Sequence, residues 1–206
     1  KTNSEWLFNF FNHPITIRPN LQVRMPSFNF TDLQWNAIIK AFQHIDNRNL
    51  LLESDFSFDH SSQKYKSGKK LHSFGACNNC HFYGENFPIQ GPQTWAPNLA
   101  LTKKRLRPEW VVQWLDNPAL IMPGTKMPAP YIPDSLALLL DSALDTWGID
   151  IMNLGGDRQA MLEGLRNYIY SIEGKVDISQ IIKDYFKENG YDFNLEEEEE
   201  FDDEEW

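Results

Sequence analysis

The chain has 206 residues, a formal net charge of −10 and a hydrophobic content of 41%. These values suit one ordinary globular domain, or a small domain with extensions, and exclude a wholly disordered chain. No apolar run approaches the roughly 18–20 residues that a membrane-spanning helix requires. The best candidate, Leu136 to Leu140, ends at Asp141.

The negative charge is concentrated at the end of the sequence. Residues 196–206 hold nine of the 29 acidic side chains and no basic one, which leaves about −1 for the rest of the chain. Such a block is typical of a solvated, self-repelling tail, and steering of a basic partner is the alternative. The charge balance argues against nucleic acid as a partner.

The sequence contains an internal repeat. Residues 5–14 (EWLFNFFNHP) match residues 109–118 (EWVVQWLDNP) in the opening Glu-Trp, the apolar and aromatic positions and the closing proline. A basic residue followed by Met-Pro then occurs in both copies, as Arg24-Met25-Pro26 and as Lys126-Met127-Pro128. Because these features share one order, duplication explains the likeness better than chance.

Each copy leads to a predicted amphipathic helix. The first spans 31–45, with Thr31 or Asp32 as its N-cap, and the second spans 157–172. Their apolar faces hold Trp35, Ile38, Ile39 and Phe42 in the first, and Met161, Leu162, Leu165, Tyr168 and Ile169 in the second. The predicted organisation is a half-repeat over 1–50, a linker over 51–61, a main domain over 62–175, and a helical arm with the acidic tail over 176–206.

The most specific pattern is Cys77-Asn78-Asn79-Cys80-His81, a C-x-x-C-H sequence typical of c-type haem attachment. Two thiols three positions apart can form thioethers with the vinyl groups on one porphyrin edge, and the next histidine can ligate the iron. A redox dithiol or half of a zinc site are the alternatives. A zinc site would need a second ligand pair, and the chain has no other cysteine; a dithiol would need a βαβ context.

The segments around this motif are predicted to be helices and loops. A helix over 62–74 would place Gly68 where another helix can approach closely. Pro108 suits the first position of a short helix that ends before Pro118. The remaining expectations are a loop over 82–97, a proline-rich loop over 122–133 that carries Met127, a helix over 136–147 within extra residues 134–154, and an amphipathic segment over 178–186.

Three pieces in this order resemble class I cytochromes c. They are Cys77 to His81, then Pro97-Asn98-Leu99, and then Lys126-Met127-Pro128 followed by a helix with Tyr168-Ile169. The likeness covers about residues 62–174. It implies an all-α class I cytochrome c fold in which helix 62–74 crosses helix 157–172 at Gly68, with one covalent haem c held beside them. The half-repeat, the insertion at 134–154 and the acidic tail depart from the family pattern.

The resemblance also implies roles for single residues. His81 would be the proximal iron ligand, with its second ring nitrogen donating to the carbonyl of Pro97. Met127 would be the distal ligand; the alternative is Met122, which lies in a turn-like Met-Pro-Gly sequence. Arg105 would lie near a haem propionate, and Trp95 and Trp114 could line the pocket or serve only in the core. For His72 we expect a surface or helix-packing position.

An iron closed by histidine and methionine has no open position for a substrate, so the expected function is one-electron transfer. The chain would be a carrier or a subunit of a larger respiratory or redox complex, with redox proteins, other cytochrome subunits or a membrane complex as partners. Because c-type haem is attached outside the cytoplasm, we expect a periplasmic or similar location, with an export signal removed from the sequence that begins at Lys1. The alternatives are a haem enzyme or gas sensor with a labile sixth position, a protein with a structural haem, and a half-repeat that completes a haem domain on another chain through Met25.

Overall fold

The computed structural model describes residues 1–18, 25–45 and 56–191. Over these ranges the chain is mostly helical and shows isolated β-bridges, such as that between His81 and Ala96, rather than strands. The predicted all-α class is therefore confirmed. In the same ranges, no helix is both long and apolar enough to cross a membrane. The expectations for Arg24, for the first part of the linker and for the acidic tail lie outside the described residues.

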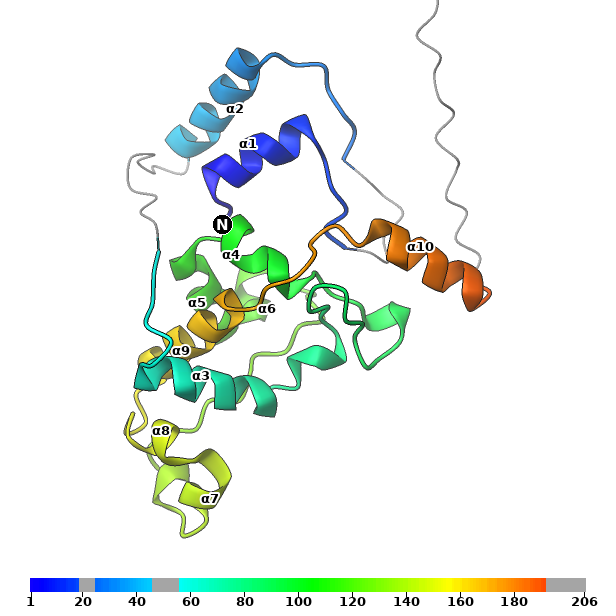
Figure 1. The fold of residues 1–206 in the computed structure, drawn as a ribbon. Helices are drawn as coiled ribbons and strands as arrows, with labels where there is room; N and C mark the ends of the chain where they lie inside the picture. Colours follow the sequence, from blue (N-terminus) through cyan, green and yellow to red (C-terminus); the bar gives the residue numbers. More distant parts are fainter. Residues whose placement is uncertain (19–24, 46–55, 192–206) are drawn as a thin grey trace, which may run out of the picture.

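Helices of different length make up the described chain (Figure 1). The α-helices are α1 (Ser4–Asn12), α2 (Asp32–Ile45), α3 (Gln63–Phe74), α4 (Thr102–Arg105), α5 (Pro108–Asp116), α6 (Pro118–Ile121), α7 (Ala143–Trp147), α8 (Ile149–Met152), α9 (Arg158–Tyr170) and α10 (Ser179–Glu188). The 3₁₀ helices are η2 (Cys77–Asn79), η3 (Pro92–Thr94), η4 (Leu99–Leu101) and η5 (Ala137–Leu139).

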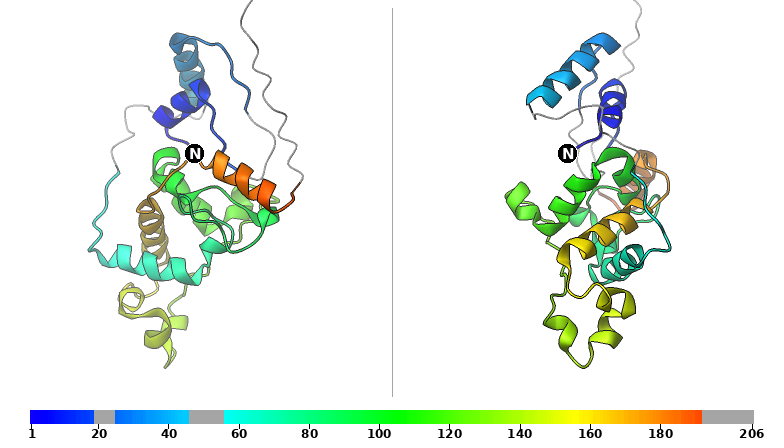
Figure 2. Two further views of the ribbon diagram at one scale, coloured as in Figure 1. Left: turned by 45° about the vertical axis from the view of Figure 1, so that its right-hand side comes forward. Right: turned by 90° about the vertical axis from the view of Figure 1, so that its left-hand side faces the viewer.

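Helices α3 and α9 cross in close contact at the centre of the main domain (Figures 1 and 2). A Cβ atom on Gly68 would lie 1.9 Å from the carbonyl oxygen of Gly164, and one on Gly164 would lie 2.2 Å from the carbonyl oxygen of Lys64. Two glycines therefore let the backbones touch, as predicted for Gly68. An ion pair between Lys64 and Glu163, with 2.6 Å from nitrogen to oxygen, borders the crossing.

Side-chain caps begin both crossing helices where the sequence predicted. The hydroxyl of Ser62 accepts a hydrogen bond from the N–H of Tyr65, and the carboxylate of Asp157 accepts one from the N–H of Ala160. Such caps satisfy backbone donors that lack a partner inside the helix. The predicted starts of the two helices are thereby confirmed.

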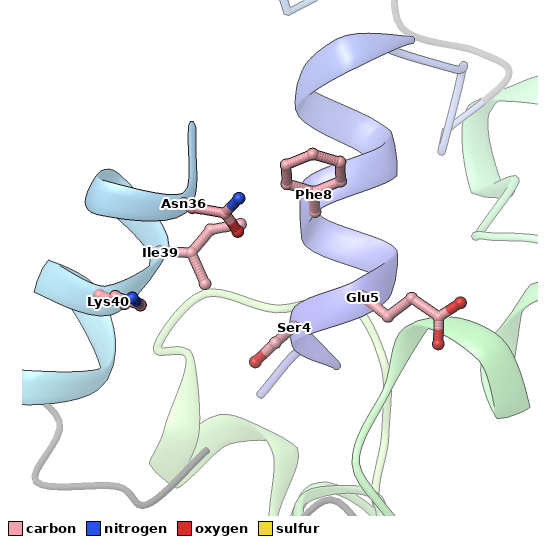
Figure 3. Close-up of a pocket in the computed structure, with 6 residues that line it drawn as sticks. All are labelled: Ser4, Glu5, Phe8, Asn36, Ile39 and Lys40. Atoms are coloured by element: carbon pink, nitrogen blue, oxygen red, sulfur yellow. The ribbon is translucent and has the colours of Figure 1, made fainter. Parts of the chain in front are cut away.

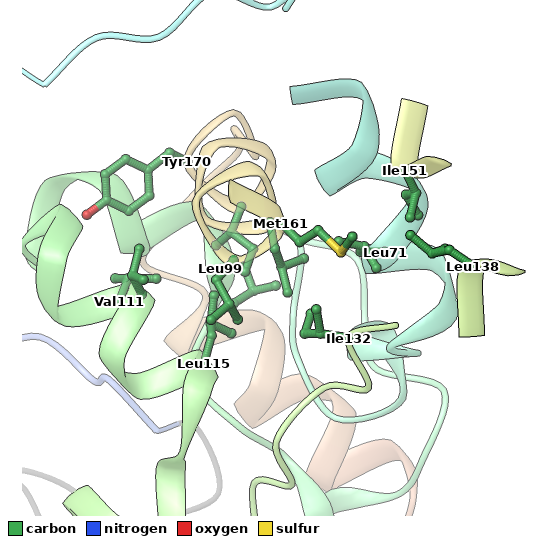
Figure 4. Close-up of a cluster of buried hydrophobic side chains, with 13 residues drawn as sticks. Leu71, Leu99, Val111, Leu115, Ile132, Leu138, Ile151, Met161 and Tyr170 are labelled. Atoms are coloured by element: carbon green, nitrogen blue, oxygen red, sulfur yellow. The ribbon is translucent and has the colours of Figure 1, made fainter. Parts of the chain in front are cut away.

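The main hydrophobic core surrounds α9 (Figure 4). Met161, Leu162 and Leu165 are almost fully buried there. Helix α9 lies between α5 on one side and α3 on the other. The other buried members of this core are Leu71, Leu99, Val111, Val112, Leu115, Ile132, Leu138, Ile151, Ile169 and Tyr170. The apolar face predicted for the helix over 157–172 is thus the centre of the core, although Tyr168 is only half-buried.

A second, smaller core holds α10. Ile178, Ile182 and Phe186 pack against Phe82 and Trp95, which belong to the loop that follows the C-x-x-C-H motif. The amphipathic segment predicted over 178–186 is therefore a helix that covers this loop.

The extra residues 134–154 do not form the single helix that was predicted over 136–147. That prediction is wrong because Leu140 adopts an extended backbone, with φ −69° and ψ 144°, which separates η5 from α7. Leu138 and Ile151 anchor the resulting lobe in the main core. The two ends of this lobe, Ser135 and Gly156, lie side by side, because a Cβ atom on Gly156 would lie 2.8 Å from the backbone nitrogen of Ser135.

The half-repeat forms a separate helical pair, α1 and α2. Thr31 and Gln34 cap α2 reciprocally: the side-chain oxygen of Gln34 accepts from the N–H of Thr31 at 2.8 Å, and the Thr31 hydroxyl accepts from the N–H of Gln34 at 3.4 Å. Trp35 and Ile39 are buried as predicted. Ile38 is half-buried, and the prediction for Phe42 is wrong, because this side chain is 49% exposed.

Candidate functional site

The C-x-x-C-H segment folds into a tight turn directly after α3. Ala76 has a left-handed backbone with φ 46°, and η2 then brings the N–H of His81 to 2.9 Å from the carbonyl oxygen of Cys77. Both cysteines are free thiols, and Cys77 packs against the main core. Burial raises the pKa of the Cys77 thiol to about 11, whereas reactive dithiols have lowered pKa values. This environment argues against the redox-dithiol alternative.

His81 is held by the loop that faces it. Its Nδ1 atom lies 2.7 Å from the carbonyl oxygen of Pro97, so the predicted contact between these two residues is present. Burial lowers the pKa of the imidazole, and the bond to Pro97 raises it to a smaller degree. A neutral ring that donates from Nδ1 keeps a lone pair on Nε2, which is the atom a metal can use.

The Pro-Asn-Leu sequence fixes the position of that carbonyl. The side chain of Asn98 is buried; its oxygen accepts from the N–H of Gly84 at 3.0 Å and its nitrogen donates to the carbonyl of Gly84 at 2.9 Å. The N–H of Leu99 donates to the carbonyl of Phe82 at 2.8 Å. Two stretches of loop are therefore tied together directly after His81 and Pro97.

Met127 is half-buried and packs against the same main core as Cys77. The indole N–H of Trp114, on α5, donates to its sulfur at 2.9 Å. Met122, in contrast, is exposed and its backbone N–H closes α6 by donating to Pro118. The structure thus gives Met127, and not Met122, a side chain directed into the protein.

Arg105 lies at the end of α4, beneath the N-terminal segment. Its guanidinium lies 5.3 Å from the ring centre of Trp6, and its Nε atom is buried without a hydrogen-bond partner among the described residues. Burial, reinforced by the nearby Arg18, lowers its pKa to about 10. A buried donor without a partner, beside a second cation, suits an anionic group such as a carboxylate.

Trp95 lies apart from this cluster. Its indole N–H donates to the carbonyl of Gln90 at 3.0 Å, and its ring contacts Phe82 and α10. The donor that could have reached a propionate is therefore already used, and the role of Trp95 in a haem pocket stays a prediction.

A buried histidine–tyrosine pair was not predicted. His72 of α3 is buried, its Nε2 atom contacts the hydroxyl of Tyr83, and its ring lies 4.7 Å from that of Tyr168. Burial lowers the pKa of His72 to about 4. The helical position of His72 next to Leu71 was the only signal in the sequence, and the tyrosine partner comes from the following loop.

The structure therefore joins His81 to Pro97 and brings Cys77 and Met127 to one core. Trp95 packs in the smaller core beside this loop, and Arg105 lies against the N-terminal segment. Two thiols, an imidazole with a free nitrogen and a thioether form a donor set that suits a covalent haem. The described residues hold no group of three or more His, Cys, Asp or Glu side chains placed for a metal ion. Comparisons with protein-family models, with curated proteins and with solved structures find no match for this chain.

Proposed function

We propose that the chain carries one covalent haem c in a class I cytochrome c fold and transfers single electrons. The observation that carries the proposal is the 2.7 Å contact between His81 Nδ1 and the carbonyl oxygen of Pro97. It occurs in the residue that directly follows the second cysteine of a C-x-x-C-H motif. A histidine whose Nδ1 is committed to a backbone carbonyl has a fixed ring orientation and a more basic Nε2, as metal-ligating histidines require.

In this proposal Cys77 and Cys80 attach the porphyrin, and His81 and Met127 hold the iron. The bound haem would supply a one-electron Fe(III)/Fe(II) couple. The Met127 thioether, a soft and neutral donor, favours Fe(II) and so raises the potential. The Trp114 indole orients that thioether from α5.

Two hydrophobic cores border the proposed site. The main core supports Cys77 and Met127, and α10 covers the loop that carries His81. Because His81 and Met127 would both hold the iron, no position would be left for a substrate, and the chemistry that the haem would supply is electron transfer. The role of Arg105 at a haem propionate stays a prediction, because its guanidinium lies against the N-terminal segment, 5.3 Å from the ring centre of Trp6.

We also propose a location and a class of partners for the chain. Covalent haem attachment places it on the periplasmic or another extracytoplasmic face. Its partners are redox proteins, such as other cytochrome subunits or a membrane complex, and the additions at both ends of the main domain favour a subunit over a free shuttle. Contacts between electron-transfer proteins are typically small and weak.

Visible and near-infrared spectra of the haem-loaded chain test this function. We expect a methionine-to-iron charge-transfer band in the oxidised form and no spectral change when carbon monoxide is added to the reduced form. The band should disappear in Met127→Ala and persist in Met122→Ala, the matched control. Carbon monoxide that binds at once to the unmodified protein would contradict the closed site and favour a haem enzyme or sensor.

A further inference from the structure

The half-repeat and the main domain share local structure as well as sequence. Helices α1 and α5 both have nine residues and both end before a proline, at residues with similar backbone angles: φ −136° and ψ 81° at His13, and φ −152° and ψ 85° at Asn117. Each carries one stacked aromatic pair at equivalent positions. The ring centres of Trp6 and Phe10 are 4.7 Å apart, and those of Trp110 and Trp114 are 5.2 Å apart.

The second helices of the two copies can be aligned without a gap from their N-caps, Thr31 and Asp157. One stripe, a row of buried side chains along the helix, then occupies the same positions in both copies. Trp35 and Ile39 of α2 correspond to Met161 and Leu165 of α9, and all four are buried. In the half-repeat this stripe contacts α1, where Phe11 stacks on Trp35 with 4.7 Å between the ring centres. In the main domain it shares the core with α5.

A second stripe is covered in one copy only. On α9 it comprises Gly164, Tyr168 and Ser171, and α3 lies against it: Gly164 meets Gly68, and the Ser171 hydroxyl lies 3.0 Å from that of Tyr65. The equivalent residues on α2 are Ile38, Phe42 and Ile45. Ile38 is half-buried, Phe42 is 49% exposed and Ile45 is 76% exposed.

The contact between α1 and α2 also has open space (Figure 3). A cavity of about 360 Å³ lies between the two helices, with Phe8, Asn36 and Ile39 among its lining residues. The equivalents of these three residues in the main domain, Val112, Leu162 and Leu165, are all buried in the main core. The indole nitrogen of Trp35 and the side-chain oxygen of Gln43 are buried and have no hydrogen-bond partner among the described residues.

We propose that α1 and α2 form the receiving half of a second haem site. Its occupant is a helix followed by a haem-bearing C-x-x-C-H segment, of the kind that residues 63–81 supply to α9. The main domain shows what covers this surface, because α3, the helix that precedes the motif, lies on the equivalent stripe of α9. The resident α3 is already engaged with α9, so the occupant is a different polypeptide segment.

Met25 then has the place in this second site that Met127 has in the first. It is half-buried, and Met-Pro follows the nine-residue helix in both copies. The inference rests on the proposed function in so far as Met127 is an iron ligand. Ile38 stands where α9 has Gly164, so the incoming helix must bring a small residue to the crossing, as α3 does with Gly68.

The probe for this inference is a haem peptide that spans residues 56–91 of this chain, with haem attached to its two cysteines. It is added to the full haem-loaded chain, and free peptide is removed by gel filtration. We expect the chain to retain a second haem and the methionine-to-iron band to increase about twofold. Met25→Leu should abolish the increase, whereas Met127→Leu should remove the resident band and leave the peptide-dependent one.

Variants of α2 test the docking stripe itself. The double variant Phe42→Asp, Ile45→Asp should weaken retention of the peptide at least tenfold. Leu33→Asp is the matched control, because Leu33 is 80% exposed on the same helix, at the position equivalent to the exposed Gln159 of α9. A chain that retains no peptide, or one whose added band survives Met25→Leu, overturns the inference. The resident band reports on the proposed function separately, so failure of one does not conceal failure of the other.

Discussion

At the scale of single residues, the sulfur of Met127 is the group whose surroundings can be changed most cleanly. Trp114 donates its indole N–H to that sulfur. A donor on the thioether draws electron density from it and so favours the reduced iron. We predict that Trp114→Phe retains the charge-transfer band and lowers the midpoint potential of the haem by about 20 mV. This shift corresponds to a hydrogen bond that stabilises the reduced state by about 0.5 kcal/mol more than the oxidised state. Redox titration measures this, and Trp110→Phe, which removes the stacked partner instead, should leave the potential within error.

His72 makes a second prediction at this scale, on stability and pH. Its pKa is lowered from 6.5 to about 4 in the folded chain, so the unfolded chain binds the proton first as the pH falls. The free energy of unfolding should therefore decrease as the pH falls from about 6.5 to about 4, by up to about 3 kcal/mol. Urea unfolding across this range measures the decrease. His72→Phe should flatten it and His44→Phe, on the surface of α2, should not; equal slopes in all three proteins would refute the assignment.

At the scale of elements, the crossing of α3 and α9 depends on having no side chain at two positions. A Cβ atom on Gly68 would meet backbone, which cannot give way as a flexible side chain can. We predict that Gly68→Ala lowers the free energy of unfolding by about 3 kcal/mol or more, because the two helices must separate. Lys69→Ala, on the exposed side of the same helix, should change it by less than about 0.5 kcal/mol. Chemical denaturation compares the two.

The arm formed by α10 gives a further prediction. Phe186 is buried against Trp95, with 5.6 Å between the ring centres, in the small core beside the C-x-x-C-H loop. Truncating a buried phenylalanine costs about 3–5 kcal/mol. Phe186→Ala should therefore destabilise the whole main domain and shift the fluorescence of the buried tryptophan. A variant that unfolds only α10, with the urea midpoint of the main domain unchanged, would show that the arm is independent.

Several elements could be predicted from the sequence because their signals are local. Ser62 and Asp157 begin α3 and α9 as caps, and glycine at position 68 indicated the close crossing. Other features depend on partners far away in the chain. Phe42 has the spacing of a core residue but is 49% exposed, Trp95 is covered by a helix some eighty positions later, and His72 contacts Tyr83 only when the loop folds back. Tertiary packing determines these three features, and the local periodicity of the sequence does not predict that packing.

At the scale of the whole molecule, two helical pairs of similar design lie in one chain, and one of them has its outer stripe covered. In the main domain α3 covers the outer stripe of α9, whereas Phe42 and Ile45 on the equivalent stripe of α2 are exposed. This difference is the basis of the proposal that α1 and α2 receive another segment. The site at Cys77–His81 was visible in the sequence because its spacing is chemically specific, while the exposed stripe of α2 could be recognised only by comparing burial in the two copies.

The narrow base of the lobe between Ser135 and Gly156 has a consequence for how this chain can vary. Because the two ends nearly touch, the intervening residues are closed into a loop by the domain itself, and lengthening such a loop adds little entropy cost, about 0.6 kcal/mol for each doubling. The fold should therefore tolerate insertions between the two ends of the lobe. Insertions made here should leave α3, α9 and the loop that carries Met127 in their positions.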